Sequence, residues 1–396
     1  MAQKKFDEEL KGAADVARSH AHFDTVKGDK GYEAFKASLS KDFYSIPDKV
    51  ADPKIRKQLL EYLADSDFEV QIPAWNEEDT LPAIVKHLVK QTGNRGKVLV
   101  MDADSTDKTA EVAKKAGAKV IRQSDMYQCV KMDDFKNILG DPNPRGRGMT
   151  LYAFWLYRFL IQEENIPKYT VYSDSDIKNY EEYDPMPFLV YPLVFDADRD
   201  YHYLKIAKPG RNNETVMAGR CVIRGINELG MRYFNSLARD MWMITGEYVT
   251  KCSYMKKLPH CTRSFVDTYT ALYFADVERK DPNKVAIVSC PNTRLDKKND
   301  QLKEQTILYS IACNLVGTTV YNKAVQDLTM EDIQELNKKV FPMFSYYPYI
   351  PDDVNAPMQS VHIMNDRVMP SVQQLIDNGL IIKSKVAEMK KKYFGS

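Results

Sequence analysis

The sequence predicts an α/β protein built on a Rossmann-like parallel sheet, with helical additions at both ends. Strand-like and helix-like segments alternate as β-α-β-α-β from about residue 68 to residue 123. Such alternation is typical of parallel strands joined by crossover helices. The apolar run in "KVLVMDAD" (97–104) is typical of a strand buried on both faces, as parallel strands are.

Three segments are expected along the chain. Residues 1–66 are read as a helical extension, 67–320 as the main domain with halves 67–180 and 181–320, and 321–396 as a mostly helical segment. In the extension, Asp52-Pro53 suits a helix start, and one helical face carries Leu59, Leu60 and Leu63.

The first half of the main domain contains the clearest elements. Strands are expected at 68–75, 97–104 and 119–123. The first helix, 76–93, is expected to carry Glu77, Glu78 and Asp79 in its first turn, where acids suit the helix dipole. The second helix, 105–118, is expected to be capped by Ser105 or Thr106.

The rest of the chain gives a looser pattern. Residues 124–148 are read as a connector, followed by a helix at 149–165 and a strand at 168–176. A further strand (201–210) and helix (227–243) follow. In the last segment "FPMFSYYPYIPDD" interrupts the helical pattern, and the basic 383–396 stretch is read as a solvated helix end.

Composition excludes several classes of protein. The 396 residues are 44% hydrophobic, enough for a large core, and 56 basic against 55 acidic residues disfavour a strongly basic nucleic-acid binder. No apolar run reaches the ~20 residues of a membrane span, and no signal-type stretch opens the chain. Six cysteines without CxxC spacing argue against a zinc site or a disulfide framework and favour the cytoplasm.

Acidic clusters stand at the ends of three predicted strands: "PAWNEE" (73–78), "DADSTD" (102–107) and "DSD" (174–176). One such acid is usually a cap or a solvated group. Because ligands of parallel α/β sheets bind beyond the carboxyl ends of the strands, three clusters on one rim favour a shared site for a nucleotide and a divalent cation.

The residue types suggest roles at this rim. Asp174 and Asp176, on alternate sides of an extended segment, place one carboxylate on the metal and the other on the sugar, ribose or a metal-bound water. Asp102 or Asp104 accepts hydrogen bonds from a uracil or ribose. In "RGRG" (145–148), the arginines suit phosphate and the glycines allow close approach, although the motif alone is a weak signal.

Four segments, "PAWNEEDTL", "MDADSTDKT", "PRGRGMTL" and "YSDSDIKN", occur in the order and rough spacing seen in GT-A glycosyltransferases. More narrowly, the chain resembles the retaining glucosyl-3-phosphoglycerate synthases, with "MAGRCV", "TGEYVTKCSYMKKLP" and "RSFVDTYTALYFAD" extending the likeness over about 68–315. The resemblance implies a GT-A sheet, with nucleotide binding in 67–180 and acceptor binding in 181–320.

The resemblance also implies a role for individual residues. The nucleotide donor would meet Pro73, Ala74, Asn76, Glu77, Asp102, Asp104, Gly146, Arg147, Gly148, Asp174 and Ser175. Mg²⁺ or Mn²⁺ would be bound by Asp176, Asp174 and Asp296. The residues implied in catalysis are Asp176, Arg147, Glu247 and Asp267, the last two holding sugar hydroxyls. The acceptor would meet Gly219, Arg220 and Asn299.

The sequence departs from the family pattern at several positions. Arg147 replaces the lysine of the G-K-G loop, Thr245 the first glycine of G-G-E-Y, and Val222 a threonine near the acceptor arginine. The family's late metal-binding histidine has no counterpart, and Asp296 stands one residue out of register. His260 and Cys261 are read as a loop pair of no assigned role.

The function expected from the resemblance is metal-dependent, retaining transfer of glucose from a UDP-sugar to a small phosphorylated acid such as 3-phosphoglycerate. The changed acceptor residues and the Lys390–Lys392 tail keep a hydroxymethylated DNA base open as an alternative acceptor. A nucleotidyltransferase and a non-catalytic sugar-nucleotide-binding protein are alternatives of other classes, and a homodimer is left open.

Overall fold

A computed structural model describes most of the chain from residue 46 onward. The described residues are 46–65, 67–93, 95–139, 146–163, 165–207, 246–263, separate positions between 266 and 297, 327–344, 346–349, 359–362 and 367–395.

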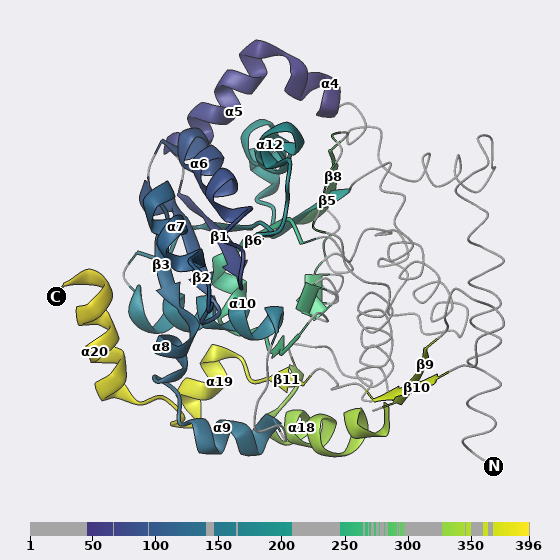
Figure 1. Cartoon of the computed structure of the whole chain (residues 1–396). Coiled ribbons are helices and arrows are strands. Elements are labelled where there is room, and N and C mark those ends of the chain that lie inside the picture. Colours follow the sequence, from purple (N-terminus) through teal and green to yellow (C-terminus); the bar gives the residue numbers. More distant parts are fainter. Residues whose placement is uncertain are drawn as a thin grey trace, which may run out of the picture.

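A seven-stranded sheet runs through the described part of the chain in the order β3-β2-β1-β4-β6-β5-β8. Its strands are β1 (Phe68–Ala74), β2 (Val98–Asp102), β3 (Lys119–Arg122), β4 (Tyr169–Tyr172), β5 (Tyr203–Ala207), β6 (Tyr248–Lys251) and β8 (Val285–Ser289). All neighbouring pairs are parallel except those that β6 makes with β4 and β5. The predicted α/β sheet is therefore confirmed (Figure 1).

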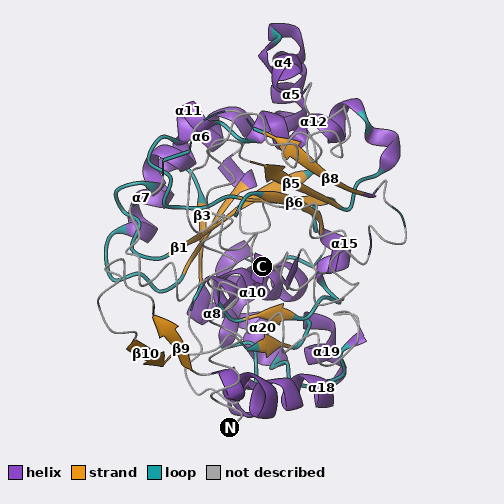
Figure 2. Ribbon diagram, turned by 90° about the vertical axis from the view of Figure 1, so that its right-hand side faces the viewer, coloured by secondary structure: helices purple, strands orange, loops and turns teal. Residues whose placement is uncertain are grey.

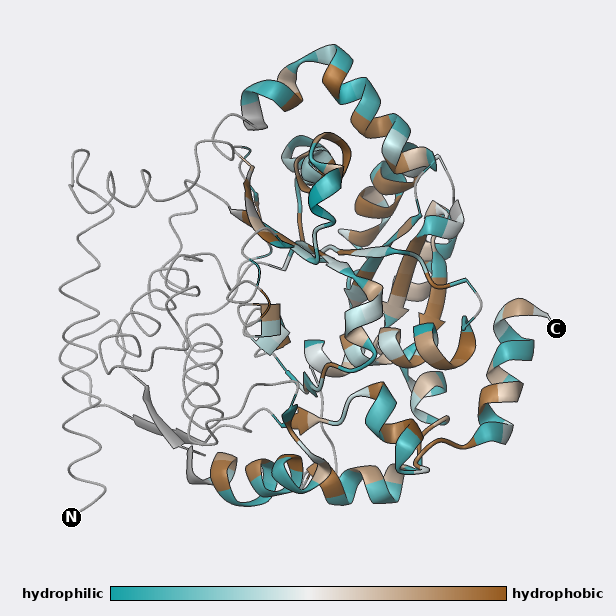
Figure 3. Cartoon of the chain, turned by 180° about the vertical axis from the view of Figure 1, so that it is seen from behind, coloured by the Kyte–Doolittle hydropathy of each residue, from teal (hydrophilic) through white to brown (hydrophobic). Residues whose placement is uncertain are grey.

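Alternate residues of the central strands pack into two different cores. In β2, Val98 and Val100 belong to one buried cluster, and Leu99 and Met101 belong to the other. Successive side chains of a strand point to opposite faces, so a strand covered on both sides is apolar throughout. This explains the continuous apolar run in the sequence, and Figure 3 shows brown strands lying between helices of mixed colour.

One face of the sheet is covered by helices from the first half of the chain. They are α4 (Ile46–Ala51), α5 (Pro53–Asp65), α6 (Leu81–Thr92), α7 (Thr109–Ala116), α11 (Tyr180–Tyr183) and α12 (Met186–Phe195). The side chain of Asp52 accepts the backbone N–H of Lys54, which begins α5 as expected. Leu59 and Leu63 are fully buried against α6 and α12, so this part of the predicted extension packs onto the sheet domain.

The other face is covered by α8 (Gln123–Tyr127), α9 (Met132–Leu139), α10 (Arg147–Leu156) with a π-helical turn (Tyr157–Ile161), α15 (Cys252–Met255), α18 (Met330–Glu335), α19 (Val372–Asp377) and α20 (Lys383–Phe394). Figure 2 shows α6, α7 and α12 above the strands and α8, α10 and α20 below them. No helix among the described residues combines the length and apolar character that a bilayer crossing requires.

Several predicted boundaries were wrong in the first half. The predicted connector contains α8 and α9, whose amphipathic patterns were missed. Helix α6 begins at Leu81, so the three acids that precede it lie in a turn and not in its first helical turn. Helix α7 begins at Thr109 after Lys108, and β4 ends at Tyr172, which places both acids of the "DSD" segment in a loop.

The last segment contains strands as well as helices. Strands β9 (Tyr346–Tyr349) and β10 (Gln359–His362) pair antiparallel, and β11 (Val368–Met369) pairs with β7 (His260–Cys261). The expectation of a mostly helical segment missed these strands because runs of two to four residues are too short to show a period. Pairing of β11 with β7 brings the end of the chain back to the main domain.

Candidate active site at the carboxyl rim of the sheet

The carboxyl ends of β1, β2 and β4 lie side by side because these strands are parallel neighbours. Ala74, the last residue of β1, is paired in register with Asp102, the last residue of β2. The loops that follow carry the predicted acids. The structure thus brings all three acidic segments to one rim.

The loops after β1 and β2 are joined by hydrogen bonds. The Asn76 N–H donates to Ser105 Oγ over 3.0 Å, and Asn76 Oδ1 accepts the Thr106 N–H over 3.0 Å. The Glu77 N–H donates to Thr109 Oγ1 over 2.7 Å. Asn76 adopts a left-handed conformation with φ 55°, which asparagine tolerates better than most residues. These contacts give the rim a defined backbone.

The two acids after β2 differ in their surroundings. Asp102 is fully buried, its Oδ1 accepts the Ser105 N–H over 3.2 Å, and Arg122 Nε lies 3.8 Å from its Oδ2. Asp104 is exposed and accepts a hydrogen bond from Ser124 Oγ over 2.6 Å. Only Asp104 therefore presents its side chain at the surface.

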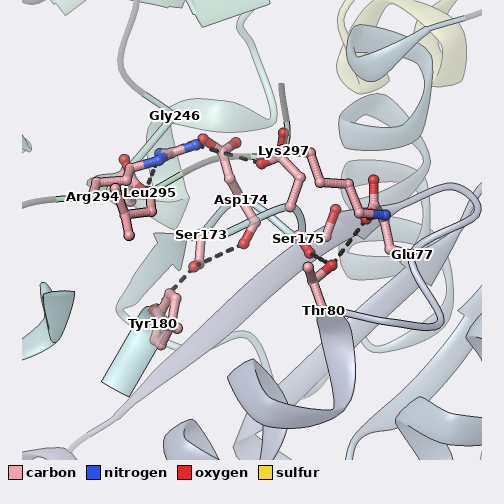
Figure 4. Close-up of polar contacts among 12 residues, drawn as sticks. Glu77, Thr80, Ser173, Asp174, Ser175, Tyr180, Gly246, Arg294, Leu295 and Lys297 are labelled. Carbon is pink, nitrogen blue, oxygen red and sulfur yellow. Dashed lines mark hydrogen bonds and ion pairs between the residues drawn. The ribbon is translucent and has the colours of Figure 1, made fainter. Parts of the chain in front are cut away.

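Asp174 lies directly after β4 between two arginines. Its Oδ1 is 2.5 Å from Arg147 Nη1. Its Oδ2 is 2.7 Å from Nη1 of Arg294, which Figure 4 shows beside it. Arg147, the first residue of α10, also donates to the Gly246 carbonyl over 3.3 Å and lies 3.6 Å from Asp267. Five segments distant in sequence meet here.

Arg294 is the site residue that sequence reasoning missed. Its Nη1 lies 2.5 Å from Glu247 Oε1 and its Nη2 lies 3.5 Å from Asp176 Oδ1, and its side chain is only 5% exposed. The available signal was its place shortly after β8, because β8 runs parallel to β4 and its carboxyl end faces the same rim.

A second ion pair connects the edge of this cluster. Lys297 Nζ lies 2.6 Å from Glu77 Oε2, and the Lys297 N–H donates to the Asp176 carbonyl over 3.1 Å. Thr80 Oγ1 donates to the Ser175 carbonyl over 2.7 Å. The loop after β1 is thereby joined to the loop after β4 (Figure 4).

Two glycines are required by close approach. A Cβ on Gly246 would lie 2.2 Å from Asp174 Oδ1, and a Cβ on Gly148 would lie 1.8 Å from the Cys261 carbonyl oxygen. Gly148 therefore contacts the chain's own backbone. The Met149 N–H donates to the Thr262 carbonyl over 2.9 Å, which holds the start of α10 against β7.

Burial and charge act in opposite directions on the ionisable groups. Burial raises the pKa of Asp267, and the nearby Arg147 guanidinium opposes that rise. Burial favours neutral Arg147, but the carboxylates of Asp174 and Asp267 outweigh it and raise its pKa above the ordinary value. The pKa of Lys297 is raised because its bond to Glu77 outweighs burial. Arg147 and Lys297 thus remain cationic.

The exposed fractions distinguish the acids as ligands for a cation. Glu247 is fully buried and the Asp174 side chain is 12% exposed, whereas Asp176 is 31% exposed. Among the described residues no three His, Cys, Asp or Glu side chains are grouped as a metal site. Because Mg²⁺ is commonly bound through one or two carboxylates plus substrate phosphates, Asp176 with Asp174 still suits a hard cation in donor chemistry.

The acceptor side lies outside the described residues. The predicted acceptor residues Gly219, Arg220 and Asn299 are not among the described positions. The same holds for the predicted metal ligand Asp296 and for Arg145 of the "RGRG" segment. Pro73 and Ala74 are the last two residues of β1, and Gly146 precedes α10 with φ 119°.

Comparisons with known proteins find similarity to glycosyltransferases in sequence and in fold. Residues 69–126 match the family model described as glycosyl transferase family 2. A stretch of 51 residues is 53% identical to 4,4'-diaponeurosporenoate glycosyltransferase of Staphylococcus haemolyticus, covering 13% of each chain.

Solved structures are similar over most of the chain. Glucosyl-3-phosphoglycerate synthase from Mycobacterium tuberculosis, in complex with Mn²⁺, UDP-glucose and phosphoglyceric acid, matches with a TM-score of 0.52 at 17% identity, covering 80% of this chain and 94% of that one. A further mycobacterial protein matches with a TM-score of 0.50 at 20% identity, covering 80% and 90%. The chain therefore has the GT-A fold, and residues 69–126 within it match the family 2 glycosyltransferase model.

Proposed function

We propose that this protein is a glycosyltransferase that moves a sugar from a nucleotide sugar to an acceptor hydroxyl. The observation that carries the proposal is the meeting of Asp174, Asp176, Glu247, Arg147 and Arg294 at the carboxyl rim of a GT-A sheet. Carboxylates and guanidinium groups together suit a sugar diphosphate, whose hydroxyls need acceptors and whose phosphates need cations.

Leaving-group stabilisation is the main catalytic demand. As the bond between the sugar and the diphosphate breaks, negative charge grows on the diphosphate. Arg147, a quarter exposed at the start of α10, is the guanidinium that would meet this charge. A divalent cation, Mg²⁺ or Mn²⁺, held by Asp176 with Asp174 would neutralise the same charge.

Accessibility separates the two acids after β2, whereas the roles of the buried Glu247 and Asp267 are taken from the family resemblance. Asp104 would bind the nucleoside at the surface, whereas the buried Asp102 would hold the loop through Ser105. Glu247 and Asp267 would accept hydrogen bonds from the sugar hydroxyls. UDP-glucose is favoured because it is the donor bound by the similar mycobacterial enzyme.

The proposed acceptor is a small phosphorylated acid. Phosphoglyceric acid is bound by that same mycobacterial enzyme, and Arg220 with Gly219 and Asn299 would provide the acceptor side here. If configuration is retained, the acceptor attacks the face that the diphosphate leaves, and a departing phosphate oxygen takes the acceptor proton. Such a reaction needs no strong protein base.

The test is a transfer assay with labelled donor and a single-residue variant. Wild-type protein with UDP-glucose, 3-phosphoglycerate and Mn²⁺ is expected to form a labelled product and UDP. Asp176→Ala should lower turnover at least about 100-fold, the size expected when a group that stabilises transition-state charge is removed. Asp133→Ala, on the exposed face of α9, is the matched control and should keep wild-type turnover.

Two results would overturn the proposal. Near-wild-type turnover of Asp176→Ala would remove the site. Absence of nucleoside diphosphate release from UDP-, GDP- and ADP-sugars, with pyrophosphate release from a nucleoside triphosphate instead, would make the protein a nucleotidyltransferase. Thermal stabilisation by the donor panel shows binding independently of turnover.

A further inference from the structure

Tyr393, near the end of α20, is bonded to the end of β3 and to α8. Its hydroxyl accepts the Arg122 N–H over 3.2 Å and donates to Asp125 Oδ2 over 2.5 Å. Lys392 Nζ lies 2.7 Å from the same carboxylate oxygen. Asp125 is buried, so its charge is compensated by the last turn of α20. The predicted helix end is present and Lys392 is exposed, but Tyr393 and Lys392 also bond to the sheet domain, which the prediction did not include.

The residues just before α20 contact the residues that follow α8. The Lys131 N–H donates to the Leu380 carbonyl over 2.9 Å, and the Ile382 N–H donates to the Cys129 carbonyl over 2.8 Å. Residues 380–394, hereafter the C-terminal segment, are thus bonded to the chain on both sides of α8. A five-residue helix has little stability of its own, so tertiary contacts of this kind must position it.

The opposite side of α8 contacts the proposed donor site. Ser124 Oγ donates to Asp104 Oδ1 over 2.6 Å. Thr150 Oγ1, in the first turn of α10 behind Arg147, donates to Gln123 Oε1 over 2.8 Å. Two consecutive residues of α8 therefore touch the loop after β2 and the helix that presents the guanidinium.

We propose that Tyr393 is a positioning residue for nucleotide binding, acting through α8 on Asp104 and on the start of α10. This inference rests on the proposed function. Among the described residues the C-terminal segment reaches the rim at Arg122, the last residue of β3, and it also holds the short helix α8. Loss of the Tyr393 hydroxyl should weaken donor binding. The chemical step should change little, because the groups it depends on are already in place once the donor is bound.

The aromatic ring and the hydroxyl of Tyr393 can be separated experimentally. The ring packs edge-on against Tyr157 with ring centroids 6.0 Å apart. Phe394 stacks on Tyr157, and Lys119 Nζ lies 4.0 Å from the centroid of the Phe394 ring. These contacts dock α20 without the hydroxyl. Burial raises the pKa of Tyr393, so the hydroxyl stays protonated and able to donate. Tyr393→Phe therefore removes the two bonds of the hydroxyl, to Asp125 of α8 and to Arg122 of β3, and leaves the helix docked.

The experiment compares Tyr393→Phe with Lys390→Ala in the full chain. Lys390 lies on the same helix as Tyr393 but pairs with Glu163, away from α8, so it is the matched control. We expect Tyr393→Phe to raise the Kd for UDP and the KM for UDP-glucose three- to tenfold with kcat within twofold, and Lys390→Ala to change neither. Hydrogen exchange of 122–128 should be faster only in Tyr393→Phe, without ligand.

A second variant tests the route through Asp125. Asp125→Asn should raise the Kd for UDP as Tyr393→Phe does. The Kd of the double variant should not exceed that of the weaker-binding single variant, because both substitutions remove the same contact. Wild-type Kd and wild-type hydrogen exchange in Tyr393→Phe would overturn the positioning role. Failure of the wild-type protein to bind UDP or to transfer sugar would instead overturn the proposed function, while the exchange comparison would still report on the contact.

Discussion

His260 shows how strongly one buried residue depends on its surroundings. It lies in β7 with 1% exposure, between Tyr152 and Trp155, and neither ring nitrogen has a hydrogen-bond partner among the described residues. The sequence was read as placing it in a loop with no assigned role, and the loop was wrong because His260–Cys261 form β7. Burial lowers its pKa to about 3, which keeps the imidazole neutral at ordinary pH.

This pKa predicts a pH-dependent stability. Below about pH 6.5 the unfolded chain binds a proton at His260 that the folded chain does not bind until about pH 3. The free energy of unfolding therefore decreases as the pH is lowered through this range, by up to about 1.4 kcal/mol per pH unit. Above pH 6.5 this contribution is constant. His260→Phe should flatten the decline between pH 6.5 and 4.5 in urea unfolding, and parallel wild-type and variant curves would contradict the prediction.

At the scale of elements, the rim is organised by loops that bond to one another. The turn after β1 contains Asn76 in the left-handed region, and its side chain and backbone hold the loop after β2. This geometry explains why α6 starts later than the acids suggested. Residues before Leu81 are used for loop contacts that helical geometry would not allow.

Two substitutions at Asn76 separate its backbone and side-chain contributions. Asn76→Gly loses the Thr106 bond but keeps the conformation, whereas Asn76→Ala also incurs left-handed strain. We expect Asn76→Ala to lower the free energy of unfolding by about 1 kcal/mol more than Asn76→Gly. Urea midpoints at constant m-value measure the difference, and equal losses would show that the strain is relieved by a shift of the turn.

At the scale of the molecule, the sheet separates two cores, and a buried ion pair lies on one side of it. Arg158, fully buried in the π-helical turn, pairs with Glu69 of β1, and Gln162 Nε2 donates to the same carboxylate over 2.9 Å. Such a pair contributes little net stability compared with apolar side chains of equal volume, but one partner alone leaves an uncompensated charge.

The pair predicts non-additive stability. Arg158→Met should lower the free energy of unfolding by about 3–5 kcal/mol, and adding Glu69→Leu should recover most of that loss. Chemical unfolding of both single variants and the double variant completes the cycle. A double variant less stable than Arg158→Met would mean that Glu69 has another essential partner.

The sequence by itself determined the α/β class, the order of the strands from 68 to 123 and the acids at their ends, because periodicity and turn residues are local properties. Tertiary structure decided which cations meet those acids. Arg294 lies 118 residues from Asp176 and 47 from Glu247, Gly246 is required only because Asp174 folds against it, and Tyr393 reaches Asp125 across 268 residues. Such pairings depend on which strands become neighbours in the sheet, and the spacing of residues along the chain does not specify the neighbours.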